Sequence, residues 1–176
     1  MNDRIYIAGG RAGTFPCTST WYSSVDVYEP GLDAWSRLPN MNDARGAPST
    51  TAAVGYYSEA NYTNTVVVPE GCAAVVIKGR LYVIGGSDHN TPLNSVEYYD
   101  TALDRWTEVA SMHVPRYGLA AVALPMNDTI MVTGGWDGAR CLKSAEIYSV
   151  SNDRWSLEEI AMNEERMYHA VVLYSS

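Results

Sequence analysis

Short apolar runs and stretches of alternating apolar and polar residues follow one another along most of the chain. Both patterns are typical of β-strands of about 5–7 residues. Pairs that favour tight reversals, such as Lys78-Gly79 and Asn127-Asp128, stand between several of these segments. No segment predicts a long helix, so we expect an all-β chain. The predicted strands lie at 4–9, 24–29, 34–38, 72–77, 80–85, 95–100, 105–109, 118–124, 129–134, 144–149, 154–157 and 168–174.

The predicted strands belong to a unit that occurs three times. In each copy a glycine pair follows an apolar strand, and a Tyr, a Trp seven residues later, a Met and an Arg come next. Paired glycines let the chain bend with positive φ, and the large aromatic side chains can reach a neighbouring sheet. A four-stranded sheet of about 50 residues needs a neighbour on each face, as in a propeller. The repeated positions are Gly9, Gly10, Tyr28, Trp35 and Arg45, then Gly85, Gly86, Tyr99, Trp106 and Arg116, and then Gly134, Gly135, Tyr148, Trp155 and Arg166.

With these landmarks the chain resembles the kelch-repeat family. Residues 85–118 and 134–148 are most similar to the kelch domains of BTB–kelch adaptors of cullin ubiquitin ligases. The resemblance implies a β-propeller with blades of four antiparallel strands. Twelve predicted strands make about three blades, whereas closed propellers have ~4–8. We therefore expect a partial propeller. It is either a fragment of a six-bladed ring, which we favour, or half of a ring that a second copy completes head to tail.

The repeats divide the chain into one kelch-repeat domain over residues 1–176. Blade 1 is expected at about 1–46 with a closing strand at about 168–174, blade 2 at about 71–116 and blade 3 at about 117–166. The remaining residues, about 47–70, form an insertion that is short of charge and rich in Thr and Tyr. We expect an extended surface loop with room for a small hairpin. It can serve equally as a specific binding loop or as a tolerated insertion.

Composition narrows the choice of function. The chain has 176 residues, 47% of them hydrophobic, and a net charge of −8. These values indicate a globular unit and argue against a nucleic-acid partner, which would need a basic surface. No apolar run reaches the ~20 residues of a membrane span, and the N-terminus lacks the features of a secretory signal. We expect a cytoplasmic protein, with a nuclear location or a piece of a longer chain as alternatives.

The candidate chemistry does not predict a catalytic centre. The three cysteines, Cys17, Cys72 and Cys141, lie far apart and favour reduced thiols over a zinc site or a disulfide framework. The three histidines, His89, His113 and His169, share no metal-ligand spacing. We therefore predict no catalytic residue, no metal site, no cofactor and no enzymatic activity. Because some kelch proteins are enzymes, an enzyme that acts on sugars or with a bound metal is one alternative. A cytoskeletal or structural scaffold is another.

Each repeat also carries one acidic residue two positions before its Tyr: Asp26, Glu97 and Glu146. These acids equal the repeat arginines in number. Each Arg can bind an acid or backbone carbonyls within or between blades, because buried charges need partners. Alternatively, the arginines can face the ring mouth and bind an acidic peptide. Repetition favours the structural interpretation, since a specific site would differ from blade to blade.

Positions that differ between the repeats are the candidates for specific binding. They follow each glycine pair and each repeat arginine, and in BTB–kelch adaptors the corresponding positions line the ring-mouth pocket. The resemblance thus implies a protein-interaction module that recognises a protein or peptide ligand, as in the substrate recognition of a cullin ubiquitin ligase adaptor. We expect no nucleic-acid or membrane partner, and a homodimer or further blades to complete the ring. The predicted binding residues are Arg11, Ser87, His89, Tyr117, Trp136, Arg140 and Met167.

Overall fold

The computed structural model of the chain describes residues 5–8, 11–14, 17–21, 24–29, 32, 34–42, 51–57, 62–68, 71–88 and 91–173. This part of the chain contains β-strands and a single turn of 3₁₀ helix, η1 (Pro125–Asn127), with no α-helix. The all-β prediction is confirmed. Among the same residues, no helix is long and apolar enough to cross a membrane.

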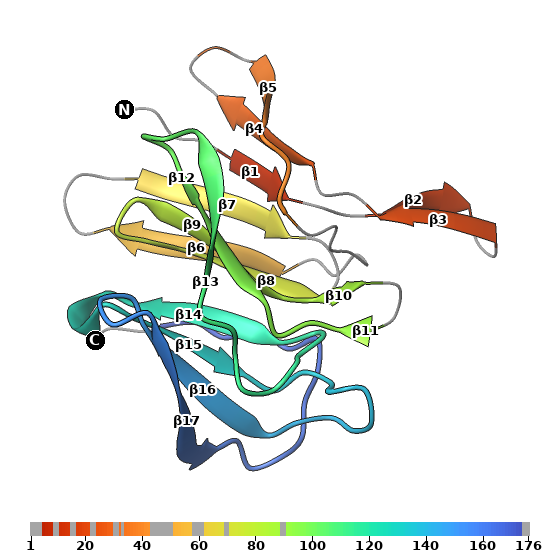
Figure 1. Cartoon of the computed structure of the whole chain (residues 1–176), viewed down its shortest axis with the longest axis vertical. Helices are drawn as coiled ribbons and strands as arrows, with labels where there is room; N and C mark the ends of the chain where they lie inside the picture. Colours follow the sequence, from red (N-terminus) through yellow and green to blue (C-terminus); the bar gives the residue numbers. More distant parts are fainter. Residues whose placement is uncertain are drawn as a thin grey trace.

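Three main sheets follow one another from top to bottom in Figure 1. The first sheet has the order β5-β4-β1-β7-β6, the second β13-β12-β9-β8 and the third β14-β15-β16-β17. The first comprises β1 (Ile5–Ala8), β4 (Val25–Glu29), β5 (Ala34–Leu38), β6 (Thr51–Tyr57) and β7 (Tyr62–Val68). The second comprises β8 (Cys72–Ile77), β9 (Arg80–Gly85), β12 (Val96–Asp100) and β13 (Arg105–Val109). The third comprises β14 (Ala120–Leu124), β15 (Thr129–Thr133), β16 (Ser144–Ser149) and β17 (Arg154–Ala161).

The second and third sheets are antiparallel throughout, as the repeat predicts. β5, β8, β9, β13 and β16 have the predicted bounds. β17 extends to Ala161, beyond the predicted end at 157, because a bulge at Ser144 and Ala145 keeps it paired with β16.

Residues 168–173 form no strand, although the sequence predicts one there to close the first blade. Hydrogen bonds explain the difference. The Tyr168 amide donates to the Gly118 carbonyl, 2.7 Å, and the His169 ring contacts the Thr133 hydroxyl, 2.8 Å. These contacts hold the segment beside the third sheet, whereas β1 lies in the first. The division of the chain into blades stays a prediction.

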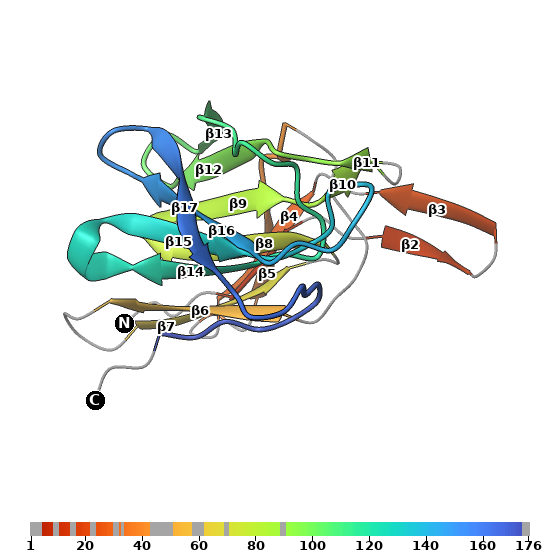
Figure 2. The same cartoon turned by 90° about the horizontal axis from the view of Figure 1, so that it is seen from below.

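The insertion forms the antiparallel hairpin β6–β7. β7 pairs in parallel with β1, so the hairpin extends the first sheet instead of forming an isolated surface loop. β6 also contacts β8 and β14, which are the edge strands of the second and third sheets. Figure 2 shows the hairpin along this side of the molecule. The insertion therefore does contain a hairpin, and this hairpin is part of the first sheet.

Two apolar clusters lie between the sheets, and β8 contributes to both. Its alternate residues Cys72, Ala74 and Val76 pack with the first sheet's Val25 and Val27. The residues between them, Ala73, Val75 and Ile77, pack toward the third sheet. A strand that is buried on both faces needs apolar residues at every position, which accounts for the continuous apolar run in the sequence.

The repeat tryptophans connect neighbouring sheets. The indole N–H of Trp106 donates to the Pro39 carbonyl, 2.9 Å, and that of Trp155 donates to the Ala110 carbonyl, 2.8 Å. Both indoles are buried, with 8% and 3% of their surface exposed, whereas Trp35 in the first sheet is 56% exposed. The difference follows from packing, since the indoles of Trp106 and Trp155 each lie against residues that follow the preceding sheet.

Candidate partner-binding site

Short hairpins after the glycine pairs lie on one side of the molecule in Figures 1 and 2. The hairpin β2 (Arg11–Thr14) and β3 (Cys17–Trp21) follows β1, and the hairpin β10 (Ser87–Asp88) and β11 (Thr91–Pro92) follows β9. In the third sheet the same place holds residues 136–141, closed by a bridge between Trp136 and Cys141. A Cβ at Gly138 in this loop would lie 3.8 Å from the Pro92 ring. We refer to residues 87–88, 91–92, 117–118 and 136–141 as the mouth loops.

Tyr117 and Trp136 are joined through their backbones. The Tyr117 amide donates to the Trp136 carbonyl, 3.0 Å, and the Trp136 amide donates to the Tyr117 carbonyl, 2.7 Å. This reciprocal pair fixes two half-buried aromatic residues side by side, although they are 19 positions apart in the sequence.

The Tyr117 ring lies over Gly71 and against Tyr168. A Cβ at Gly71 would lie 2.3 Å from the ring, so only a glycine leaves space for it there. The rings of Tyr117 and Tyr168 meet edge to face, with centroids 5.6 Å apart, a favourable arrangement for aromatic pairs. Amides of Gly118 and Tyr168 donate to the carbonyls of Gly71 and Gly118, 2.8 and 2.7 Å. These bonds connect the second sheet, the third sheet and the C-terminal segment.

Arg140 lies on a turn that Asp137 stabilises. The Asp137 carboxylate accepts hydrogen bonds from the amides of Ala139 and Arg140, 2.8 and 2.9 Å. These bonds, that of Arg140 first, lower the pKa of Asp137. The exposed Arg140 guanidinium approaches the same carboxylate at 3.7 Å. A fixed turn therefore presents a cation in the loop that the Trp136–Cys141 bridge closes.

The remaining predicted binding residues differ in their exposure and in how much of them the structure describes. Met167 is half-buried, and its Cβ would lie 3.5 Å from a Cβ at Gly118, so it belongs with Tyr117. Ser87 is buried in β10, which leaves its side chain closed to a partner. Arg11 begins β2, where only its backbone is described, and His89 lies outside the described residues. Tyr168, which is exposed and adjoins Tyr117, was missed. Its place in the repeat could have indicated it, because Tyr168 follows the repeat arginine Arg166 by two residues, as Gly118 follows Arg116.

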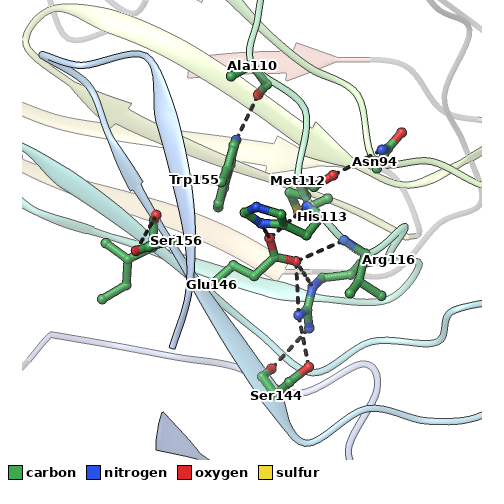
Figure 3. Close-up of polar contacts among 11 residues, drawn as sticks. Asn94, Ala110, Met112, His113, Arg116, Ser144, Glu146, Trp155 and Ser156 are labelled. Atoms are coloured by element: carbon green, nitrogen blue, oxygen red, sulfur yellow. Dashed lines mark hydrogen bonds and ion pairs between the residues drawn. The ribbon is translucent and has the colours of Figure 1, made fainter. Parts of the chain in front are cut away.

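Glu146 and Arg116 form a buried ion pair (Figure 3). Nε and one terminal nitrogen of Arg116 each lie 3.2 Å from Oε1 of Glu146. The guanidinium also donates to the carbonyls of Gly134 and Ser144 and to the Ser144 hydroxyl, at 2.8, 3.0 and 2.9 Å. Neither side chain of the ion pair is exposed.

The second carboxylate oxygen of Glu146, Oε2, binds the segment that connects the second and third sheets. It accepts the His113 amide at 2.8 Å and lies 2.9 Å from Nδ1 of the His113 ring, while Oε1 also accepts the Val114 amide at 3.2 Å. Glu97 of the second sheet is used in the same way, since its carboxylate accepts the Asn42 amide at 3.0 Å. Glu97 and Glu146 therefore bind the backbone that leaves the preceding sheet.

Arg116 thus binds an acid and backbone carbonyls, and its side chain is enclosed and cannot reach a partner. Burial lowers the pKa of the Arg116 guanidinium, and Glu146 opposes that effect. Because the ordinary pKa of arginine is so high, the group stays charged. Arg45 lies outside the described residues. Arg166 is instead exposed and pairs with Glu164, 3.1 Å.

Within the described part of the chain, no group of three or more His, Cys, Asp or Glu side chains is arranged to hold a metal ion. His113 and His169 serve structural contacts instead, with Glu146 and with Thr133. Cys72 is buried and Cys141 is half-buried, and within the described residues neither forms a disulfide.

Comparison with known proteins identifies the repeat. A family model described as the Kelch motif matches residues 1–42, 70–113 and 115–158. The chain belongs to the kelch-repeat family. Its second and third sheets are kelch blades of four antiparallel strands, and the described part of the chain forms part of a propeller.

Kelch proteins of several kinds are similar to this chain. An F-box/kelch-repeat protein of Arabidopsis thaliana is 40% identical over 61% of the chain and 18% of its own length. Alpha-scruin of Limulus polyphemus is 34% identical over 68% of the chain and 11% of its own length. Kelch repeat and BTB domain-containing protein 13 of Homo sapiens is 28% identical over 68% of the chain and 20% of its own length. The chain thus spans no more than a fifth of these relatives.

Proposed function

We propose that this kelch domain is a protein-interaction module whose mouth loops recognise an extended peptide or loop of a partner protein. The main support for this proposal is the group formed by Tyr117, Trp136, Tyr168 and Arg140. Aromatic residues and arginine are the side chains that most often dominate binding energy at protein interfaces. Here contacts between the second sheet, the third sheet and the C-terminal segment bring together aromatic residues from separate parts of the sequence.

The rigidity of the group supports the proposal. Reciprocal backbone bonds hold Tyr117 to Trp136, and the Asp137 turn holds Arg140. A loop backbone that is already ordered loses little conformational entropy on binding, so more of the contact energy appears as affinity.

We further propose that this recognition serves a ubiquitin ligase. The relatives that contain a BTB domain or an F-box support this role, and the resemblance of residues 85–118 and 134–148 to BTB–kelch adaptors agrees with it. The partner would then be the substrate of the ligase. The alternatives of a kelch-scaffold enzyme and a cytoskeletal scaffold stay predictions, as does a cytoplasmic location.

Binding can be tested with a peptide selected on the 176-residue chain from a displayed random library. The double variant Tyr117→Ala/Trp136→Ala should bind this peptide more than about 30-fold more weakly, which corresponds to a loss of about 2 kcal/mol. Isothermal titration calorimetry measures the change.

Leu103→Ala is the matched control for this experiment. Leu103 is exposed, but it lies on the turn between β12 and β13, at the end of the second sheet opposite the glycine pair. The control should bind the peptide as the wild type does. Unchanged affinity in the double variant, or an equal loss in Leu103→Ala, would show that the peptide binds elsewhere.

A further inference from the structure

The segment that follows the repeat arginine packs in the same way on the second and third sheets. A Cβ placed on Gly85 or on Gly134, the first glycine of each pair, would meet the same three groups. These are the carbonyl of the repeat arginine, a methionine methyl group and the side chain three residues after the arginine. That side chain is Leu119 in the earlier segment and His169 in the later one. The two segments can therefore be compared position by position.

His169 makes this contact polar. On the second sheet, Leu119 and Ile84 are buried in one apolar cluster, with 3% and 0% of their surface exposed. On the third sheet, Thr133 occupies the position of Ile84, and its hydroxyl lies 2.8 Å from Nε2 of His169. Nδ1 of His169 is buried with no hydrogen-bond partner within the described residues. A titratable contact thus stands where the second sheet has an apolar one.

Tyr168 departs from the repeat at the neighbouring position. The corresponding residue is Gly118, which has a φ of +65°, and Tyr168 has a φ of +54°. A residue with a side chain is strained in this left-handed region, whereas glycine is not. The Tyr168 amide donates to the Gly118 carbonyl at 2.7 Å, and its ring meets that of Tyr117 edge to face. Tyr168 is therefore held against Tyr117 in a strained backbone conformation.

Protonation of His169 would weaken what holds this segment. A protonated imidazole donates from both of its nitrogens. Nδ1 would then carry a charged N–H group in a buried place where no acceptor is available within the described residues. Burying a charge without a hydrogen-bond partner is costly, and the cost disappears when the ring moves into water. The proton therefore favours a ring that has left its site beside Thr133.

The charged neighbours of His169 act in the same direction. Within the described residues, the charge that acts on the ring is that of Arg166, which pairs with Glu164 at 3.1 Å. Burial, and then Arg166, lowers the pKa of His169. Arg116 also reaches the carbonyl of the first glycine of the third pair, but Glu146 balances its charge. The buried ring is thus favoured in its neutral form.

We propose that residues 167–169 form a pH-sensitive strap, in which neutral His169 holds Tyr168 against Tyr117 and protonated His169 releases it. The two contacts belong to adjacent residues, so a ring that leaves Thr133 takes Tyr168 with it. Release also relieves the strained backbone of Tyr168. Because Tyr168 belongs to the group proposed to bind the partner, acid would weaken recognition. That consequence rests on the proposed function, whereas the strap itself does not.

The test is hydrogen exchange of single amides in the 176-residue chain, followed by NMR at pH 7.5 and 5.5 and corrected for the intrinsic effect of pH on exchange. The protection of the Tyr168 amide should fall about five- to tenfold, where tenfold is the limit for a released ring with a pKa of about 6.5. The Gly118 amide, which donates to the Gly71 carbonyl at 2.8 Å, is the internal control. Its protection should change little.

His169→Leu/Thr133→Ile is the matched variant, because it gives the third sheet the residues found at positions 119 and 84. His169→Gln is a second variant that cannot titrate and keeps a group able to bind the Thr133 hydroxyl. In both variants the protection of the Tyr168 amide should be the same at the two pH values. An unchanged protection in the wild type, an equal fall at Gly118, or a fall that persists in the variants would overturn the strap.

Recognition is measured separately, by calorimetry with a selected peptide that contains no histidine. The wild type should bind this peptide several-fold more weakly at pH 5.5 than at pH 7.5, and the two variants should bind it equally at both. Unchanged affinity together with a loss of Tyr168 protection would overturn the role of Tyr168 in recognition and support the strap alone. The two proposals can therefore fail independently.

Discussion

The carboxylate of Glu146 has two different tasks at once. One oxygen neutralises the buried Arg116 guanidinium, and both oxygens accept amides of the connection at residues 113–114. Taking a carboxylate and a guanidinium out of water is expensive, and the arrangement is stable only because every contact is made together. Removing one partner therefore costs more than the interaction would be worth on the surface.

We expect Glu146→Ala to lower the free energy of unfolding by about 3–5 kcal/mol, because it leaves the Arg116 charge buried without its partner. Urea denaturation of the 176-residue chain measures the change. Arg37→Ala removes an exposed pair with Asp26 and should cost less than about 1 kcal/mol. Equal losses in the two variants would contradict the role given to burial.

His169 gives the C-terminal segment a dependence on pH. Its Nε2 contacts the Thr133 hydroxyl at 2.8 Å, and its Nδ1 is buried with no hydrogen-bond partner within the described residues. Burial, and then the charge of Arg166, lowers the pKa of His169 in the folded state. The neutral ring is thus favoured on folding, and the unfolded chain binds the proton more readily.

Stability from His169 should therefore be complete above the ordinary histidine pKa of about 6.5 and should decline as the pH falls below it. Between pH 7.5 and 5.5, the wild type should lose more free energy of unfolding than His169→Gln, which cannot titrate. Urea denaturation at each pH provides the comparison. Parallel losses in the two proteins would exclude His169 as the source.

At the scale of the elements, the glycine pair fixes how a strand end meets the next unit. Gly85 has a φ of +61°, and a Cβ there would lie 2.6 Å from the Arg116 carbonyl oxygen. That oxygen accepts the Gly86 amide at 2.9 Å, so the backbone cannot move away without losing a hydrogen bond. The pair is needed both for its backbone conformation and for the close approach of the segment that contains Arg116.

Two alanine variants separate the cost of the positive φ from the cost of the close approach. Gly79 also has a positive φ, +73°, but no atom lies within 4 Å of a Cβ placed there. Gly79→Ala should cost about 1–2 kcal/mol for the backbone alone. Gly85→Ala should cost about 1–3 kcal/mol more, because of the added clash. Thermal or urea unfolding tests the difference, and equal costs would show that the close approach is unimportant.

The strands of the second and third sheets could be predicted closely because local patterns determine them. Continuous apolar runs such as residues 72–77 and glycine turns such as Lys78-Gly79 are local features of the sequence. The hairpin β6–β7 could not be placed, since its pairing with β1 joins residues about 60 positions apart. The missing strand at 168–173 has the same cause, because pairing depends on which edge lies nearby.

At the scale of the whole molecule, contacts between residues that are distant in the sequence also limited how well the candidate site could be predicted. The repeat placed Tyr117, Trp136 and Met167 in corresponding loops, and the structure brings them together. It could not reveal that Ser87 is buried or that Tyr168 packs on Tyr117, because both depend on the neighbouring unit. Position within a repeat predicts which loop a residue occupies. Burial is determined only when the units are assembled.

The parallel pairing of β7 with β1 has a consequence for behaviour at high concentration. An unpaired strand edge is a template on which other chains can add without limit, and many β-proteins aggregate by this route. In this molecule the chain's own insertion occupies the edge of β1. Growth by strand addition is thereby blocked at that position, while side-chain contacts between faces remain available.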